Sequence, residues 1–125
     1  MIEINEALTL LSKTYPGFRD EFVGNAQSWI GDNGEFLHYV LITSLSTLVV
    51  RNIDEGNYEN IDELFSLVES IMINGTEEAS NLISVGFLES LQNQTDVDPK
   101  YWAPLLGPEA VEFCKARDDF HGIKS

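Results

Sequence analysis

Residues 60–91, NIDELFSLVESIMINGTEEASNLISVGFLESL, decide the fold of this chain. Apolar residues in the first half recur every three or four positions, which is the spacing of one helix face, and they are Ile61, Leu64, Phe65, Val68, Ile71 and Met72. Asn60 is predicted to cap this helix, with Glu63 completing a capping box. Gly75 is predicted to end it at a positive φ.

A second helix follows in the same stretch, because Thr76 is a favourable cap and Glu77 and Glu78 suit the positive first turn. Its inner face comprises Ala79, Leu82, Ile83, Gly86 and Leu91. The connection is so short that the two helices should be antiparallel neighbours, with Phe65 and Leu82 packed inward. Gly86 is unfavourable within a helix, and a close helix crossing explains it best.

The segments before this hairpin also have helical periodicity. The first predicted helix begins near Ile4 and ends before Tyr15-Pro16-Gly17. A second helix is predicted from Phe22 to Ile30, followed by a turn at Gly31-Asp32-Asn33-Gly34.

Between Glu35 and Ile53 the apolar residues surround the whole helical cylinder, which predicts a buried helix. Two other interpretations of this segment are a membrane span, which its polar residues and length disfavour, and a strand near its β-branched end. After a loop at Asp96-Val97-Asp98-Pro99, Pro108 opens a last helix through Phe120.

We therefore expect one all-α domain over residues 1–125, with about six helices arranged as antiparallel pairs around a buried central helix. A short solenoid of stacked helical pairs is an alternative arrangement.

The chain is strongly acidic, with 21 Asp and Glu against 7 Lys and Arg among 125 residues, and a net charge of −14. Such a charge repels nucleic acid and anionic lipid, so we expect neither as a partner. The single cysteine and the acidic start of the chain, which is unlike a signal peptide, favour a cytoplasmic protein.

Motifs for catalysis or metal binding are absent from the sequence. His38 and His121 have no metal-ligand spacing, and Cys114 has no flanking histidine to act as its base. We expect structural roles for His38 and Cys114, a frayed helix end at His121, and neither enzymatic activity nor a metal or cofactor.

The distribution of charge is the unusual feature. No Lys or Arg lies between Arg51 and Lys100, while this stretch contains 11 acidic residues. A solvated surface is one explanation. The other is a site for a basic partner, because such a field steers cationic proteins. For that site the sequence nominates Glu55, Tyr58, Glu59, Asp62, Glu63 and Glu69, and as a second location the loop from Asp96 to Trp102.

Two short strings, Gly86-Phe87-Leu88-Glu89-Ser90-Leu91-Gln92-Asn93 and Leu105-Leu106-Gly107-Pro108, resemble segments of small acidic helical immunity proteins of bacterial polymorphic-toxin and contact-dependent growth inhibition systems. The resemblance implies a cytoplasmic, non-enzymatic inhibitor of a toxin C-terminal domain, often a nuclease. It carries over no toxin-binding residues.

The sequence thus predicts an immunity protein that neutralises a cognate toxin, with a basic nuclease domain as the expected partner, by non-covalent occlusion in a 1:1 complex. By itself the protein is expected to be a monomer or a weak homodimer. An acidic helical adaptor or regulatory subunit that binds another basic protein is the alternative, and a small helical enzyme is a third, less favoured class.

Overall fold

The computed structural model describes residues 1–24, 31, 37–94 and 96–120 of the chain. Its helices are α1 (Ile4–Thr14), α2 (Pro16–Gly24), α4 (His38–Asp54), α5 (Ile61–Asn74), α6 (Glu77–Asn81), η1 (Leu82–Leu88), α7 (Glu89–Asn93), η2 (Pro99–Tyr101), η3 (Ala103–Leu105) and α8 (Pro108–Phe120). Within these residues the only β-bridge, between Ile2 and Gly75, is isolated and belongs to no strand. The prediction of an all-α fold is confirmed.

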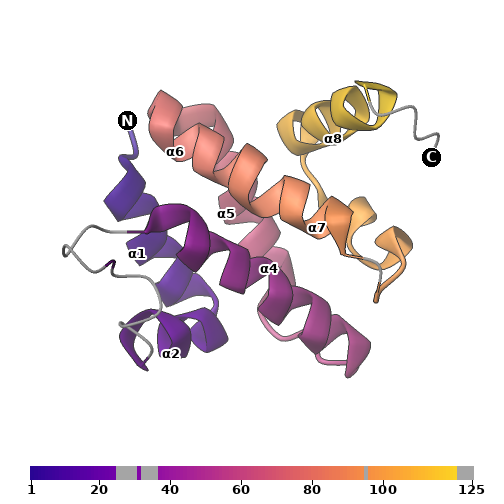
Figure 1. The fold of residues 1–125 in the computed structure, drawn as a ribbon, viewed down its shortest axis with the longest axis horizontal. Coiled ribbons are helices and arrows are strands. Elements are labelled where there is room, and N and C mark those ends of the chain that lie inside the picture. The colour runs from indigo at the N-terminus through magenta and orange to yellow at the C-terminus, as the bar shows by residue number, and fades with distance from the viewer. Residues whose placement is uncertain (25–30, 32–36, 95, 121–125) are drawn as a thin grey trace.

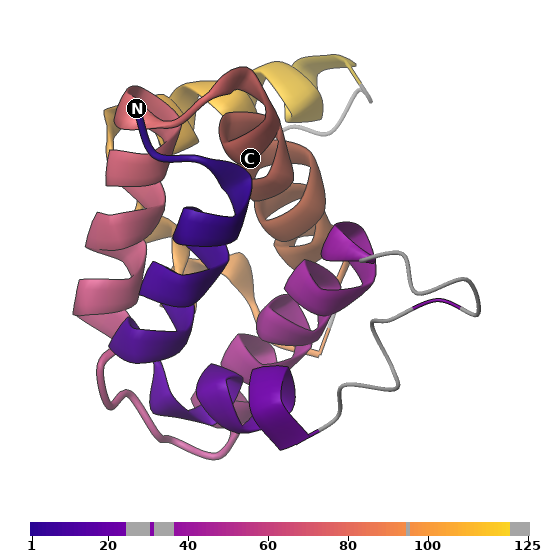
Figure 2. The same cartoon turned by 90° about the vertical axis from the view of Figure 1, so that its left-hand side faces the viewer.

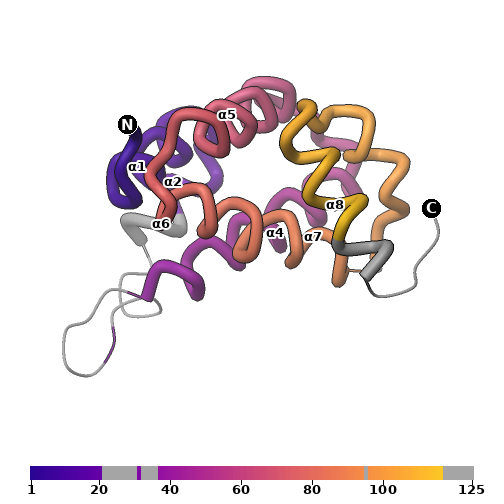
Figure 3. Tube along the Cα trace, turned by 90° about the horizontal axis from the view of Figure 1, so that it is seen from above, coloured from indigo at the N-terminus to yellow at the C-terminus, as the bar shows by residue number. Residues whose placement is uncertain are grey.

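The helices from α4 to α7 run back and forth through the molecule (Figure 1). The helix formed by α6, η1 and α7 lies beside α4, and α5 crosses behind both (Figures 1 and 3). The α5–α6 connection is short, so α5 and α6 form the antiparallel pair that the sequence predicts. Helix α1 packs against α5 and α2 against α4, while α8 packs on α5 and η1 (Figure 2).

The connection between α1 and α2 differs from the sequence prediction. Helix α2 begins at Pro16, immediately after Tyr15 ends α1, whereas the sequence predicted a helix from Phe22 onward. Proline favours the first position of a helix, because its φ is already helical and it needs no N–H partner there. Residues 25–30 of that predicted helix, and most of the predicted turn that follows, lie outside the described residues.

Helix α4 is less buried than its composition predicts. Its inward face is covered, but Tyr39 and Val40 are about half exposed, at 46% and 50%. The prediction of burial on all sides is therefore wrong for this helix. The strand considered for its end is also not formed, because α4 continues to Asp54.

The most enclosed segment is η1, a π-helical stretch within the otherwise α-helical run from Glu77 to Asn93. Among its residues only Val85 is exposed. The rings of Phe87 and Phe65 lie 5.9 Å apart, which joins η1 to α5 in the core. Phe65 and Leu82 are both buried, as the sequence predicts.

Two features of η1 explain its contact with α4. A side-chain carbon on Gly86 would lie 2.5 Å from Cγ2 of Ile42, so only glycine fits this crossing without a shift. The buried Ser46 Oγ donates a hydrogen bond to the Phe87 carbonyl oxygen at 3.1 Å. The prediction that Gly86 marks a close crossing is confirmed.

The ends of α5 and the start of α6 test the predicted caps. Thr76 accepts a hydrogen bond from the Ala79 N–H at 3.2 Å, so this cap is confirmed. Asn60 precedes α5 but has a left-handed φ of 61° and makes no capping bond. A capping side chain needs an extended backbone, so the predicted capping box with Glu63 is not formed.

Gly75 ends α5 as predicted, but with φ −83° instead of a positive value. Its side-chain position is blocked, because a Cβ would lie 2.4 Å from the Ile71 carbonyl oxygen. Close packing, and not a left-handed backbone, therefore explains this glycine.

His38 and Cys114 have structural surroundings in this fold. His38 is half-buried, and its Nε2 lies 3.1 Å from Asn5 Oδ1, which links α4 to α1. Cys114 is buried on α8. His121 lies outside the described residues. Across the part of the chain that is described, no helix has the length and apolar character needed to cross a bilayer.

Candidate functional site

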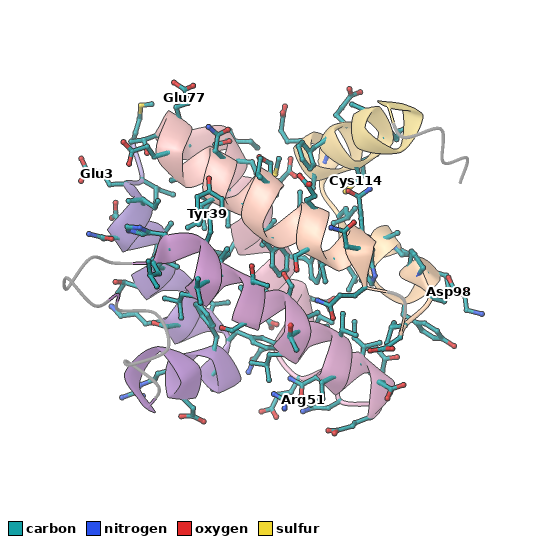
Figure 4. All side chains as sticks on the ribbon, viewed as in Figure 1. Glu3, Tyr39, Arg51, Glu77, Asp98 and Cys114 are labelled. Carbon is teal, nitrogen blue, oxygen red and sulfur yellow. The ribbon has the colours of Figure 1, made fainter. Side chains whose placement is uncertain are left out.

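A cleft of about 240 Å³ opens where the end of α4 meets the loop between α7 and η3. Its lining comes from two stretches far apart in the sequence and consists of Ile53, Asp54, Gly56, Tyr58, Asp96, Val97, Asp98 and Tyr101. We call it the acidic cleft. Figure 4 shows Asp98 at the edge of the molecule, with Glu77 on a distant part of the surface.

Buried apolar residues support the acidic cleft from below. Ile53 and Val97 line it and are only 4% and 6% exposed, and the neighbouring Trp102 is buried as well. These residues anchor both stretches in the core, so the polar side chains above them project from a fixed base.

Tyr58 lies in the connection between α4 and α5, which is held in place by hydrogen bonds of its backbone N–H groups. Gly56 has a φ of 78°, which glycine adopts without a steric penalty. The Asn57 N–H donates to the Asn52 carbonyl oxygen at 2.8 Å, and Asn57 Oδ1 accepts from the Glu59 N–H at 3.1 Å. These bonds hold the connection while the Tyr58 side chain stays 47% exposed.

The opposite side of the cleft is organised by Asp98. Its Oδ1 accepts a hydrogen bond from the Lys100 N–H at 2.9 Å, and its carbonyl oxygen accepts from the Tyr101 N–H at 3.1 Å. These bonds start the short helix η2, which presents Tyr101 at the cleft with 48% of its surface exposed.

The charge of the lining is entirely negative. Asp54, Asp96 and Asp98 line the cleft, and no lysine, arginine or histidine does. Within the described residues, the carboxylates of Asp54 and Asp96 have neither an ion-pair nor a hydrogen-bond partner. The lining itself is therefore a local source of negative potential.

The position of Asp54 is unfavourable for the helix that carries it. Asp54 is the last residue of α4 and Glu55 caps that end, where the helix dipole already places partial negative charge. Two acids at this end raise the free energy of the folded state. Residues that oppose local stability in this way are typical of functional sites.

The residues nominated from sequence separate into different places. Tyr58 lines the acidic cleft, and Glu55 is exposed beside it in the same connection. Glu59 lines a second cavity, described below. Asp62 and Glu63 are exposed in the first turn of α5.

Glu69 has an intramolecular role. Its two carboxylate oxygens accept hydrogen bonds from the N–H groups of Glu109 and Ala110, at 2.8 and 3.1 Å, and so cap the start of α8. Gly107 makes room for this cap, because a Cβ there would lie 2.5 Å from Glu69 Cγ. Glu69 therefore supports the fold, and it lies outside the acidic cleft.

A second cavity of about 220 Å³ lies on the other side of the α4–α5 connection and is lined by Tyr15, Pro16, Gly17, Leu48, Asn52, Asn57, Glu59 and Asn60. Asn52 Nδ2 donates to the Tyr15 hydroxyl oxygen at 2.7 Å. Burial raises the pKa of the Tyr15 hydroxyl, and this hydrogen bond lowers it by less. This cavity is richer in amides than in charge.

Neither cavity brings together a set of side chains that could hold a metal ion. Across the described residues, no group of three His, Cys, Asp or Glu side chains is placed to hold a metal ion. Carboxylates beside half-exposed tyrosines are instead suited to ammonium or guanidinium groups, through charged hydrogen bonds and cation–π contacts.

The comparisons with known proteins identify one family. No curated protein and no solved structure matches the chain. Residues 8–122 match the model of a family described as a domain of unknown function, DUF7674. Because this match covers most of the sequence, the chain belongs to the DUF7674 family.

Proposed function

We propose that this domain binds a basic protein partner and that a cationic side chain of the partner enters the acidic cleft. The observation that carries the proposal is the cleft lining, in which three aspartates and two half-exposed tyrosines occur without a basic residue. Tyrosine is a frequent anchor of protein interfaces, and aspartates around it favour a cation over a neutral side chain.

The size of the cleft favours a side chain over a small molecule. Its volume of about 240 Å³ is below the usual range for small-molecule sites, which is roughly 300–1,000 Å³. An arginine or lysine side chain attached to a larger partner fits this volume. The net charge of −14 would then accelerate encounter with a positively charged protein.

As the biological form of this binding we propose toxin immunity. A nuclease domain carries a basic groove for its phosphate substrate, and a protein seated on that groove or its rim excludes the nucleic acid. This mechanism needs a tight 1:1 complex and no covalent change. The sequence resemblance to immunity proteins and the acidic cleft both support it.

The alternative is an adaptor that uses the same cleft for a different basic protein. The identity of the partner separates the two functions. A toxin gene beside the gene for this chain supports immunity, and a basic partner without toxicity supports the adaptor.

The test is co-expression of the chain with the toxin domain encoded beside it, scored by cell survival and co-purification. D54N/D96N removes two charges from the acidic cleft, and E77Q/E78Q removes two from the exposed first turn of α6. We expect the wild type and E77Q/E78Q to protect and D54N/D96N to protect poorly. Equal protection by both variants would contradict the proposed site, and no protection by any chain would contradict immunity.

A further inference from the structure

We propose that the ring of Tyr101 is where the partner's cation binds, and that Lys100 covers this ring until the partner displaces it. This inference rests on the proposed function and assigns one contact within it. It also specifies the partner segment as one that presents an arginine.

The contact between Lys100 and Tyr101 is the observation behind this inference. Lys100 Nζ lies 5.2 Å from the centroid of the Tyr101 ring, within the range of a cation–π interaction. Lys100 is also the only basic residue between Arg51 and Lys115 in the sequence. The single cation of this acidic region is thus placed on an aromatic residue of the cleft.

The contact with the ammonium group of Lys100 therefore shows that the face of the Tyr101 ring is open to a cation. A cation–π contact made by an exposed lysine is weak, so a partner's cation can replace it. The side chain of Lys100 does not itself line the cleft, so its departure leaves the lining intact.

An arginine gains more at this position than a lysine. Its planar guanidinium stacks on the ring while its N–H groups donate to a carboxylate, and Asp96 and Asp98 line the same cleft. An incoming lysine would only exchange one ammonium for another on the ring.

The test uses a fluorescein-labelled hexa-arginine peptide and fluorescence anisotropy at low ionic strength. Replacing Lys100 by glutamine should tighten binding by roughly two- to fivefold, which is the worth of an exposed cation–π contact. The matched control is K115Q, which changes the net charge equally on an exposed part of α8. K100R should show no gain, because arginine also covers the ring.

Three further measurements complete the design. In a Tyr101→Leu background the gain from K100Q should fall to that of K115Q. Hexa-lysine should bind the wild type more weakly than hexa-arginine. Thermal melting of each variant checks that the fold is kept.

Equal gains from K100Q and K115Q would overturn this inference, because Lys100 would then act only through net charge. The proposed function fails differently: D54N/D96N would then bind the peptide as well as E77Q/E78Q does. If D54N/D96N binds the peptide more weakly than E77Q/E78Q, while K100Q and K115Q bind it equally, the acidic cleft is retained as the site and only the role of Lys100 is rejected.

Discussion

The carboxylate of Glu69 on α5 accepts a hydrogen bond from the backbone N–H of Glu109 on α8, with 2.8 Å between oxygen and nitrogen. The bond satisfies an N–H at the start of α8 that has no partner within the helix. Glu69→Ala should therefore lower the free energy of unfolding by about 1–2 kcal/mol, measured by urea denaturation. Glu63→Ala, an exposed acid on the same helix, is the control and should change it less.

Gly107 provides a second test of this cap. Gly107→Ala should destabilise the protein because the added methyl would meet the Glu69 side chain. Once Glu69 is alanine that side chain is gone, so the cost of Gly107→Ala should shrink in the double variant. Additive effects of the two changes would show that they do not share one cap.

The buried bond from Ser46 to the Phe87 carbonyl should contribute to stability. Ser46→Ala removes the donor and leaves a carbonyl of η1 without this partner, which should cost roughly 1–3 kcal/mol. Thr47→Ala on the exposed side of α4 is the control. Equal melting temperatures for Ser46→Ala and the wild type would show that the hydrogen bond adds nothing.

Tyr15 should make the protein less stable in strong alkali. Burial raises the pKa of its hydroxyl above the ordinary value of 10.0, so the folded chain holds this proton when the unfolded chain has lost it. The contribution of this hydroxyl to the free energy of unfolding is fully present below pH 10 and is lost as the pH rises through the higher pKa of the folded state. The measurement is the free energy of unfolding between pH 9 and 11. In Tyr15→Phe this free energy should decline less as the pH rises. An unchanged decline would contradict the assignment of the pH dependence to Tyr15.

Replacement of Asp54 should change the stability of the fold and the binding of a cation in opposite directions. It lies at the negative end of α4, so Asp54→Asn should raise the melting temperature and weaken the binding of a cationic ligand. Glu77 lies in the positive first turn of α6, so Glu77→Gln should lower the melting temperature and leave binding nearly unchanged. Melting temperatures that move in the same direction would contradict this interpretation of Asp54.

Local patterns were sufficient to predict much of the fold. The spacing of apolar residues predicted α1, α5 and the helix after Thr76, and Gly86 predicted a close crossing. The start of α2 at Pro16 was missed, because a proline after a helix suits both a loop and a new helix. The π-helical turns of η1 have no pattern of their own in the sequence, since apolar residues fill them as they would an α-helix.

The candidate site was predicted only in part, because tertiary structure assembles it. Tyr58 and the loop from Asp96 were recognised as separate possibilities, and the fold joins them across all of α5, α6, η1 and α7. Asp54 belongs to the same acidic stretch but had no distinguishing local signal. Glu69 was nominated for its position off the apolar face, and sequence alone did not show that α8 packs there.

The most direct test of the acidic cleft compares hexa-arginine binding to D54N/D96N and E77Q/E78Q, which carry the same net charge. If the cleft holds the cation, the dissociation constant of D54N/D96N at low salt should exceed that of E77Q/E78Q by about tenfold, as for the loss of one charged contact. Added salt should narrow the difference. Equal dissociation constants at low salt would show that the peptide responds only to total charge, and would contradict a binding site in this cleft.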